Sequence, residues 1–390
     1  MKKATIFLLI FIIAIPNGVI YGEDDLDIFD FDAKSYILIN QSTNQVLASR
    51  NCSEELLMAS TTKVMTAIVA LELIEDINGY YKVPDEASGV IGSSIYLEEG
   101  EIIPIKDLLY GLMIRSGNDS AVALAIATAG SEKHFVKLMN EKAEEIGAFD
   151  TSFANPHGLN AKNHYTTAHD LALITAYAMD NPFFREIAST TFYRSTTLEG
   201  KVRAFHSNNR FLLNYDKATA AKTGWTTEAG RCLTGASSEG AHDLVGVLLY
   251  APNWFNDLET MMNWAYAEYK GVQVIEEGVS LGLVEVKKGV EPFVAARASK
   301  DIVVSASKNT EPVITSDVEL NDKVTAPVYK GDKIGEKHIY KDGEYICTLD
   351  LVAHKEIAKE SKPWYRRFFA WRGETLRGIY QWLIKYGFSL

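Results

Sequence analysis

The sequence predicts a mixed α/β domain, then a small all-β domain, and finally a C-terminal amphipathic helix. Three observations lead to this prediction. A chain of 390 residues is too long for one ordinary hydrophobic core, so two domains are expected. Up to about residue 275, helical patterns lie between extended runs, whereas from about Gly278 short strand-like runs alternate with turn residues. The final segment carries aromatic and basic residues at helical spacing.

The chain begins with the features of a secretory signal. Two lysines precede an apolar run over residues 4–15, and an acidic segment starts at residue 23. We expect residues 1–22 to be a signal peptide that is cleaved near Gly22. A retained membrane anchor is the alternative, because the residues before Gly22 make a poor cleavage site. Either outcome carries the rest of the protein across the cytoplasmic membrane.

Residues 30–275 are predicted to form one α/β domain. Extended runs at residues 35–40 and 45–49, joined by a polar turn, predict a hairpin. Helices are expected from about residue 61 and at 105–114, 120–129, 134–146, 168–179 and 254–269, and strand-like runs return at 231–237 and 244–250. Because strands stand at both ends with helices between them, we expect one mixed sheet whose terminal strands pair, flanked by a helical region.

Residues 278–355 are predicted to form a small β-sandwich. Short strand-like runs occur at residues 283–286, 293–295, 302–304, 313–315 and 345–348. Gly, Lys, Asp and Pro separate these runs, and such spacing is typical of an all-β domain. No cluster of catalytic residue types is evident in this range.

Residues 363–390 are predicted to form an amphipathic helix. Aromatic and aliphatic residues recur on one face, at Trp364, Phe368, Trp371, Ile379, Trp382 and Tyr386, and arginines border them. Such a helix suits the headgroup region of an anionic membrane, so we expect it to hold the protein at the outer face of the cytoplasmic membrane. The alternative is a helix that packs on its own domain with solvated cations. The segment is too polar to span a bilayer.

Charge and cysteine content exclude several classes of function. The net charge of −12 argues against a nucleic-acid binder. The three cysteines are widely spaced, which supports neither a disulfide framework nor a zinc ribbon. His157, His164 and His169 lack the carboxylate spacing of a zinc peptidase, so we expect no metal and no other cofactor.

The string Ser60-Thr61-Thr62-Lys63 suggests a serine nucleophile with a lysine base. A serine hydroxyl reacts poorly until a base removes its proton. If Ser60 opens a helix, Lys63 lies one turn further on the same face. Burial and a nearby cation, for which Lys222 is the candidate, favour the neutral lysine that a base requires. Taken alone, the string is equally a helix cap followed by a solvated lysine.

Ser116-Gly117-Asn118 follows one apolar helical run and precedes another, so we expect it on a turn. The Ser116 hydroxyl is suited to relay a proton towards a leaving amine, and the Asn118 amide to bind a substrate carbonyl. An ordinary helix-start turn is the alternative, because these residue types favour turns.

Lys222-Thr223-Gly224 precedes Trp225 and a strand-like run. Gly224 removes a side chain where a substrate backbone can lie along the strand, and Lys222 and Thr223 are suited to bind a terminal carboxylate. An edge strand without a ligand is the alternative. Each motif is ambiguous alone, but all three in this order point to one active site.

Together the three motifs resemble those of the low-molecular-mass penicillin-binding proteins, which are serine-type D-Ala-D-Ala carboxypeptidases. The resemblance extends over nearly the whole chain, and further supporting strings lie at residues 92–94, 113–115, 155–159 and 228–230. It implies a β-lactamase/transpeptidase-like fold for the first domain. It also implies a peptidoglycan stem peptide as substrate and β-lactams as covalent inhibitors.

The resemblance implies roles for the motif residues. Ser60 attacks the penultimate D-Ala carbonyl of a stem pentapeptide and releases terminal D-Ala, and water then frees the shortened peptide. Lys63 corresponds to the acylation base. Ser116 and Asn118 correspond to the family's second motif.

The third motif carries the remaining implied roles. Lys222 and Thr223 match the carboxylate-binding strand, and the backbone N–H groups of Ser60 and Trp225 match the oxyanion hole. Trp225 stands where some relatives carry His. Arg210 is the candidate for an additional substrate-binding arginine.

Three other functions compete with this interpretation. A class A β-lactamase needs a carboxylate for deacylation, and no Glu-x-x-Leu-Asn string lies between the second and third motifs. A D,D-endopeptidase that cleaves cross-links would use the same residues. A catalytically silent penicillin-binding scaffold is disfavoured by the intact Ser60, Lys63 and Lys222.

Overall fold

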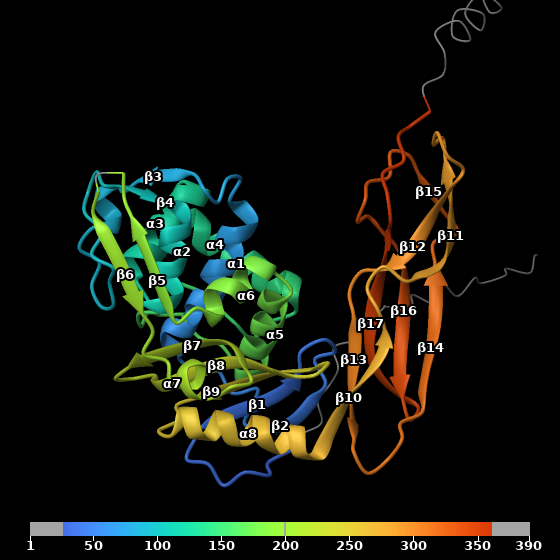
Figure 1. The fold of residues 1–390 in the computed structure, drawn as a ribbon, viewed down its shortest axis with the longest axis horizontal. Helices are drawn as coiled ribbons and strands as arrows, with labels where there is room; N and C mark the ends of the chain where they lie inside the picture. The colour runs from blue at the N-terminus through green and yellow to red at the C-terminus, as the bar shows by residue number, and fades with distance from the viewer. Residues whose placement is uncertain (1–25, 199, 361–390) are drawn as a thin grey trace, which may run out of the picture.

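The computed structural model describes residues 26–198 and 200–360. The predicted signal peptide and the predicted amphipathic helix therefore lie outside the described residues. Two bodies follow one another along the chain: an α/β body that ends with a long helix, and an all-β body that begins directly after it (Figure 1). Within the described ranges, no helix is both long enough and apolar enough to cross a bilayer.

The first body is built on a five-stranded sheet in the order β2-β1-β9-β8-β7. Its strands are β1 (Ser35–Asn40), β2 (Val46–Arg50), β7 (Ala218–Thr226), β8 (Gly230–Glu239) and β9 (His242–Leu249). β1 pairs with β9, which confirms that strands from the two ends of the domain meet. All neighbouring strands run antiparallel, so the expected mixed sheet is wrong. Short turns join β1 to β2, β7 to β8 and β8 to β9, and such hairpins force the antiparallel arrangement.

The helices cover both faces of this sheet. They are η1 (Ala59–Thr62), α1 (Lys63–Leu73), η2 (Asp85–Ala87), α2 (Ile105–Ile114), α3 (Asn118–Ala129), α4 (Glu132–Ile146), α5 (Ala168–Met179), α6 (Pro182–Ser189), α7 (Arg210–Asn214) and α8 (Trp254–Glu268). Figure 1 shows α8 along one face, with α1 to α6 gathered on the other. Two hairpins, β3 (Tyr80–Lys82) with β4 (Ile102–Pro104) and β5 (Phe192–Thr196) with β6 (Val202–His206), complete the helical region.

The sheet separates two hydrophobic cores. Along β1, Ile37 and Ile39 join the core under the helical region, whereas Tyr36 and Leu38 join the core under α8. Successive side chains of a strand point to opposite faces, so an uninterrupted apolar strand serves both cores. The three motifs singled out in the sequence lie in η1 and the start of α1, directly before and at the start of α3, and in β7, where the sheet meets the helical region.

The second body is all-β, as expected. Its strands are β10 (Tyr269–Ile275), β11 (Ser280–Lys287), β12 (Phe293–Ala298), β13 (Ile302–Ser307), β14 (Ile314–Leu320), β15 (Lys323–Thr325), β16 (Lys333–Lys341) and β17 (Glu344–Ala353). Six of them form a sheet in the order β14-β16-β17-β12-β11-β15, and β10 pairs with β13. Because β10 belongs to this body, the junction lies at the end of α8, earlier than the expected limit at residue 275.

A buried polar contact joins the two bodies. The Asn40 amide donates to Ser305 Oγ at 2.9 Å, and His242 Nε2 lies 2.7 Å from the same hydroxyl. The Ser42 hydroxyl donates to the Val303 carbonyl at 2.8 Å. These contacts join the end of β1 and the start of β9 to β13, the strand that pairs with β10.

Candidate active site

Ser60 lies in η1, the 3-10 turn that leads directly into α1. The Thr61 and Thr62 hydroxyls bind the carbonyls of Met58 and Ala59 at 2.6 and 2.8 Å, which closes the turn. Ala59 adopts a positive φ of 48°, a conformation that L-residues other than Asn and Asp rarely take. Such local strain persists only where the surrounding structure enforces it, and it is common at active sites.

The Lys63 side chain is fully buried and is directed at Ser60. Its Nζ lies 3.0 Å from Ser60 Oγ, 2.7 Å from Asn118 Oδ1 and 2.5 Å from the His157 carbonyl. A neutral amine has two N–H groups and one lone pair. The amide oxygen and the carbonyl can only accept, so they take both N–H groups and leave the lone pair facing the serine hydroxyl.

Electrostatics favour the same neutral state. Burial lowers the pKa of Lys63 well below its usual value of 10.5, and the positive charge of Lys222 lowers it further. A buried lysine that has no carboxylate partner is expected to lose its proton, because burial disfavours the charged form. Lys63 therefore has the position of a general base for Ser60, and its lowered pKa favours the neutral form that a base requires.

The loop at residues 155–159 holds Lys63 from the other side. Asn155 Oδ1 accepts from the N–H groups of His157 and Gly158 at 3.2 and 2.7 Å, and this turns the His157 carbonyl towards the amine. Gly158 has a φ of +92°, and a Cβ there would lie 2.0 Å from the Ala59 carbonyl oxygen. Only glycine fits, because the loop packs directly against the turn that carries Ser60.

Ser116 and Lys222 form the second half of the site. Lys222 Nζ donates to Ser116 Oγ at 2.9 Å and to the Thr223 carbonyl at 2.8 Å. Ser116 has a φ of +57°, a strained conformation for a residue other than glycine. In this conformation its hydroxyl points at Lys222. Lys222 is 2% exposed, and burial lowers its pKa to about 7. Its charge is near enough to Lys63 to affect that amine, so the two motif pairs share one site.

Strand β7 brings the third motif alongside η1. A Cβ on Gly224 would lie 2.7 Å from the backbone nitrogen of Ser60, so this glycine lets the strand approach the serine. The predicted contact of Gly224 with substrate stays a prediction. Thr223 lines the cavity described below, and Trp225 is 63% exposed at the end of the strand.

Most of the hydrogen-bonding groups of the Asn118 side chain are used within the protein. Its Oδ1 accepts from Lys63, and its Nδ2 donates to the Ile91 carbonyl at 2.7 Å, which leaves one amide N–H for a ligand. The adjacent Asp119 is buried and holds the loop at residues 94–97. Its oxygens accept from the Ser94 hydroxyl and from the N–H groups of Ile95 and Leu97. This carboxylate is therefore fully engaged and is not available to activate water.

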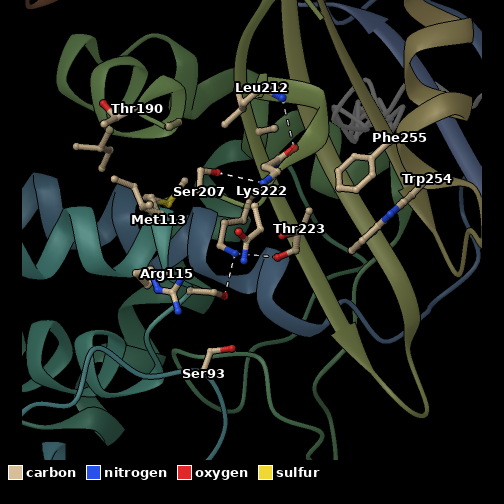
Figure 2. Close-up of a pocket in the computed structure, with 17 residues that line it drawn as sticks. Ser93, Met113, Arg115, Thr190, Ser207, Leu212, Lys222, Thr223, Trp254 and Phe255 are labelled. Carbon is tan, nitrogen blue, oxygen red and sulfur yellow. Dashed lines mark hydrogen bonds between the residues drawn. The ribbon is translucent and has the colours of Figure 1, made fainter. Parts of the chain in front are cut away.

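A cavity of about 310 Å³ opens beside Ser116, Lys222 and Thr223. Figure 2 shows Lys222 and Thr223 near its centre, Arg115 at one side, and Trp254 and Phe255 at the other. The ends of α2 and α6, the segment around α7 and the start of α8 form its walls. Arg210, the arginine that the sequence suggested for substrate binding, is exposed at the start of α7 and is not among the residues that line the cavity.

The family model described as D-alanyl-D-alanine carboxypeptidase matches residues 23–253, which include all three motifs. The chain belongs to this carboxypeptidase family. A second model, described as the C-terminal domain of penicillin-binding protein 5, matches residues 269–359. Its first matched residue coincides with the start of β10.

Relatives of the family align over most of the chain. The D-alanyl-D-alanine carboxypeptidase DacF of Bacillus subtilis is 32% identical over 340 residues, covering 84% of this chain and 86% of the relative. DacD of Escherichia coli is 28% identical over 353 residues, covering 85% of this chain and 88% of the relative. The crystal structure of penicillin-binding protein 5 from Haemophilus influenzae has a TM-score of 0.65 at 25% identity, covering 85% of this chain and 99% of that one.

The sequence motifs singled out residues that the structure brings together, but not the groups that surround them. The structure brings Ser60, Lys63 and Asn118 into direct contact, and it places Ser116 against Lys222. The use of the His157 carbonyl was missed, because a backbone oxygen leaves no signal in residue types. Arg115 was missed as a cavity residue as well. Its position directly before Ser116 was the available signal.

Proposed function

We propose that this chain is a serine D,D-carboxypeptidase that removes the terminal D-Ala from peptidoglycan stem pentapeptides through an acyl-enzyme on Ser60. The observation that carries the proposal is the buried amine of Lys63, 3.0 Å from Ser60 Oγ, with both N–H groups directed at other acceptors. The similarity to D-alanyl-D-alanine carboxypeptidases supports the same activity.

Acylation follows from these positions. Ser60 Oγ attacks the carbonyl of the penultimate D-Ala while Lys63 Nζ takes the hydroxyl proton. Backbone N–H groups of Ser60 and Trp225 stabilise the oxyanion. Ser116, 2.9 Å from Lys222 Nζ, relays the proton taken up by Lys63 to the nitrogen of the leaving D-Ala as the amide C–N bond breaks, which returns Lys63 to its neutral form. Lys222 and Thr223 bind the carboxylate of the terminal D-Ala. β-Lactams carry a carboxylate that would bind in the same place.

Deacylation uses the same groups in reverse. Water enters where the D-Ala amine has left, and a neutral Lys63 accepts a proton from it as the water attacks the ester. The shortened peptide then departs, and Ser60 recovers its proton. A class A β-lactamase would use a separate carboxylate at this step. Asp119 is the acidic residue whose charge acts on Lys63. Its oxygens accept from the Ser94 hydroxyl and from the Leu97 N–H, so it is not placed to activate water as a β-lactamase carboxylate would.

The experiment is to incubate the protein, purified without residues 1–22, with a stem pentapeptide and to measure free D-Ala. We expect release by the wild type and none by Ser60→Ala. Penicillin should label the wild type stoichiometrically and leave Ser60→Ala unlabelled. Rapid multiple-turnover hydrolysis of penicillin would favour a β-lactamase. Penicillin labelling without D-Ala release would favour a silent scaffold.

We further propose that the enzyme acts at the outer face of the cytoplasmic membrane. The support is the apolar run at residues 4–15 and the aromatic and basic pattern of residues 364–386. Deleting residues 364–390 should release the protein from vesicles that contain phosphatidylglycerol and leave D-Ala release in solution unchanged. Equal vesicle binding by the full and the shortened chain would contradict this proposal.

A further inference from the structure

The two bodies do not share a hydrophobic core. Among the described residues, the buried apolar side chains form four clusters, two in each body. Those of the first body extend no further along the chain than Tyr266, and those of the second begin at Ile275. Helix α8 passes into β10 without a loop, from Glu268 to Tyr269. A change of charge at this junction would therefore act on polar contacts that no common core reinforces.

The junction lies at one end of the β body. Figure 1 shows β10 and β13 next to the sheet of the first body, while the last described residues lie at the opposite end of the β body. There the Glu360 N–H donates to the Lys288 carbonyl at 2.7 Å, in the turn between β11 and β12. A small rotation at the junction would therefore turn the whole β body relative to the active site.

A histidine is buried where the two bodies meet. His242, the first residue of β9, is 3% exposed. Its ring packs edge-on against Tyr266 of α8, with the ring centroids 5.7 Å apart, and its Nε2 lies 2.7 Å from Ser305 Oγ of β13. Gly271 of β10 lies so close that a Cβ there would be 3.0 Å from the Cβ of His242. The ring thus contacts each of the elements that form the junction.

The hydrogen bonds of this cluster suit a neutral ring. Ser305 Oγ accepts from the Asn40 amide at 2.9 Å, and its own hydrogen can be donated to His242 Nε2. An imidazole that accepts at Nε2 carries its hydrogen on Nδ1. His242 Nδ1 is buried and has no hydrogen-bond partner among the described residues. The neutral ring therefore leaves one buried polar atom unpaired.

A charged ring fits the cluster less well. Imidazolium carries hydrogens on both nitrogens, so Nε2 would become a donor to Ser305 Oγ. The Ser305 hydroxyl would then have to turn its hydrogen away from the ring, and no other acceptor for it is present in the described parts of the chain. Two buried donors, the Nδ1–H and the Ser305 hydroxyl, would be unpaired. A buried charge without a paired partner is also costly in itself.

The ionisable groups around His242 do not compensate for burial. Their charges come from neighbouring elements, and none of them hydrogen-bonds to the ring: Asp243 on β9, Glu239 on β8 and Lys308 after β13. Glu239 is already paired with Lys217 at 2.8 Å. Burial lowers the pKa of His242 below 6.5, in spite of the two carboxylates that raise it.

The direction of the pH effect follows from this difference. If the bodies separate, water reaches the ring and its pKa returns towards about 6.5. The separated form then binds a proton more readily than the closed form. Lowering the pH below about 6.5 therefore favours separation, and the effect ends once the pH falls below the lowered pKa of the closed form.

We propose that His242 is a pH-sensitive latch between the catalytic body and the β body, closed by the neutral ring and released when the ring is protonated. The hinge is the connection of α8 to β10, where backbone torsions at Glu268 and Tyr269 can change while each body keeps its own cores. The latch is independent of the proposed peptidase activity, because neither Ser305 nor Asn40 contacts the active-site lysines or serines.

The test is amide hydrogen exchange of the protein purified without residues 1–22, between about pH 7.5 and about pH 5 and corrected for the intrinsic pH dependence of exchange. The Val303 N–H reports on the junction, because it donates across it to Ser42 Oγ at 3.0 Å. Amides between β16 and β17 are the internal reference. We expect protection of Val303 to fall below about pH 6.5, by up to about tenfold per pH unit for one proton, while the reference stays constant.

Two substitutions of histidine assign the effect. His242→Gln keeps a polar group for Ser305 but cannot be charged, so the protection of Val303 should no longer depend on pH in this window. His338→Gln is the matched control, because that ring contacts Thr348 within the β body. It should respond to pH as the wild type does.

A further variant keeps the test decisive if His242→Gln folds poorly. Asn40→Asp retains an oxygen for the N–H groups of Ser42 and Thr43 and adds a negative charge one hydroxyl away from the ring. The carboxylate stabilises the imidazolium, so acid should release Val303 much less than in the wild type.

The remaining outcomes would overturn the latch. Protection of Val303 that is constant with pH in the wild type would show that the junction does not respond to protonation. An equal fall in His242→Gln, or an unchanged response in Asn40→Asp, would assign the effect to another group. A parallel loss of protection between β16 and β17 would show unfolding of the β body instead of separation at the junction.

Discussion

At the scale of single residues, the site holds two buried lysines whose pKa values are both lowered. Lys63 has no carboxylate beside it, and its three contacts suit a neutral amine. Lys222, with a pKa of about 7, is close to the midpoint of its titration at neutral pH. An anionic substrate carboxylate would favour its charged form. The pair is therefore suited to supply a base and an anion receptor within one cleft.

The acid limb of the pH–rate profile reports on Lys63. Acylation requires this lysine to be neutral, so the rate rises with pH through its lowered pKa. Lys222→Gln removes the charge that helps to lower that pKa, so the pKa of Lys63 rises and the acid limb should move to higher pH. The measurement is the second-order rate of penicillin acylation against pH. Lys137→Gln, at an exposed helix position, is the control, and an unmoved limb in Lys222→Gln would contradict the coupling.

Two histidines make the fold sensitive to acid. His164 Nδ1 accepts from the Ala154 N–H at 3.0 Å, and His157 Nδ1 accepts from the Leu159 N–H at 3.2 Å, so neither nitrogen carries a proton. Burial lowers the pKa of both rings from 6.5 to about 4. Between these values the unfolded chain binds more protons than the folded chain, so stability falls as pH falls.

We therefore expect the free energy of unfolding to decrease between about pH 6.5 and pH 4, by on the order of 3 kcal/mol for His164 alone. Denaturant titrations across this window measure the effect. His164→Gln should be less stable at neutral pH but should show a shallower acid dependence. An equal slope in wild type and variant would contradict this assignment.

At the scale of elements, close backbone contact positions the nucleophile. The loop at residues 155–159 and strand β7 both press against η1, and each does so through a glycine, Gly158 and Gly224. The position of the Ser60 backbone N–H, the proposed oxyanion donor, therefore depends on two close contacts that leave no room for a Cβ atom. Side chains cap the starts of helices α6 and α7: Asn181 and Asn209 each accept from two backbone N–H groups.

Gly158→Ala should disable the enzyme. Its Cβ would lie 2.0 Å from the Ala59 carbonyl oxygen, so the turn that carries Ser60 must move. We expect penicillin acylation to slow at least about a hundredfold, the scale seen when an oxyanion donor is lost. Gly130→Ala is the matched control, because Gly130 has a φ of +75° but nothing within 4 Å of its Cβ position. That variant should cost about 1–2 kcal/mol of stability and leave acylation intact.

At the scale of the whole molecule, the catalytic body and the β body share a buried polar contact. Ser305 is fully buried and is within hydrogen-bond distance of both Asn40 and His242. Buried polar groups that lose a partner cost about 1–3 kcal/mol. None of the catalytic residues hydrogen-bonds to Ser305, so this contact can be altered without touching the chemistry.

Ser305→Ala should loosen the two bodies without reducing activity. It leaves the Asn40 amide and His242 Nε2 without their shared partner, so we expect a lower Tm or two resolved transitions in calorimetry. D-Ala release should stay within about twofold of the wild type. Ser307→Ala is the control, because among the described residues the Ser307 hydroxyl accepts only from the Asn309 N–H within a turn. A single unchanged transition in Ser305→Ala would show that this contact does not couple the bodies.

Secondary structure was predicted best where patterns were long and regular. The helices expected at residues 105–114 and 168–179 match α2 and α5, and the run at 35–40 matches β1. Strand β16 was missed, because Lys337 takes a largely buried position in it and hides the alternation of apolar residues. Its ammonium is satisfied by the Ser316 hydroxyl at 2.7 Å on the neighbouring strand, which only pairing with β14 provides.

The chain order of amino acids was enough to single out Ser60, Lys63 and the two accompanying motifs as candidates, because these groups depend on residue type and on spacing within a single turn. Folding alone revealed the His157 carbonyl on Lys63, the fit of Gly158 against Ala59 and the cavity beside Arg115. Each of these joins segments far apart along the chain. Such contacts arise from packing and backbone direction, and no local pattern of side chains encodes them.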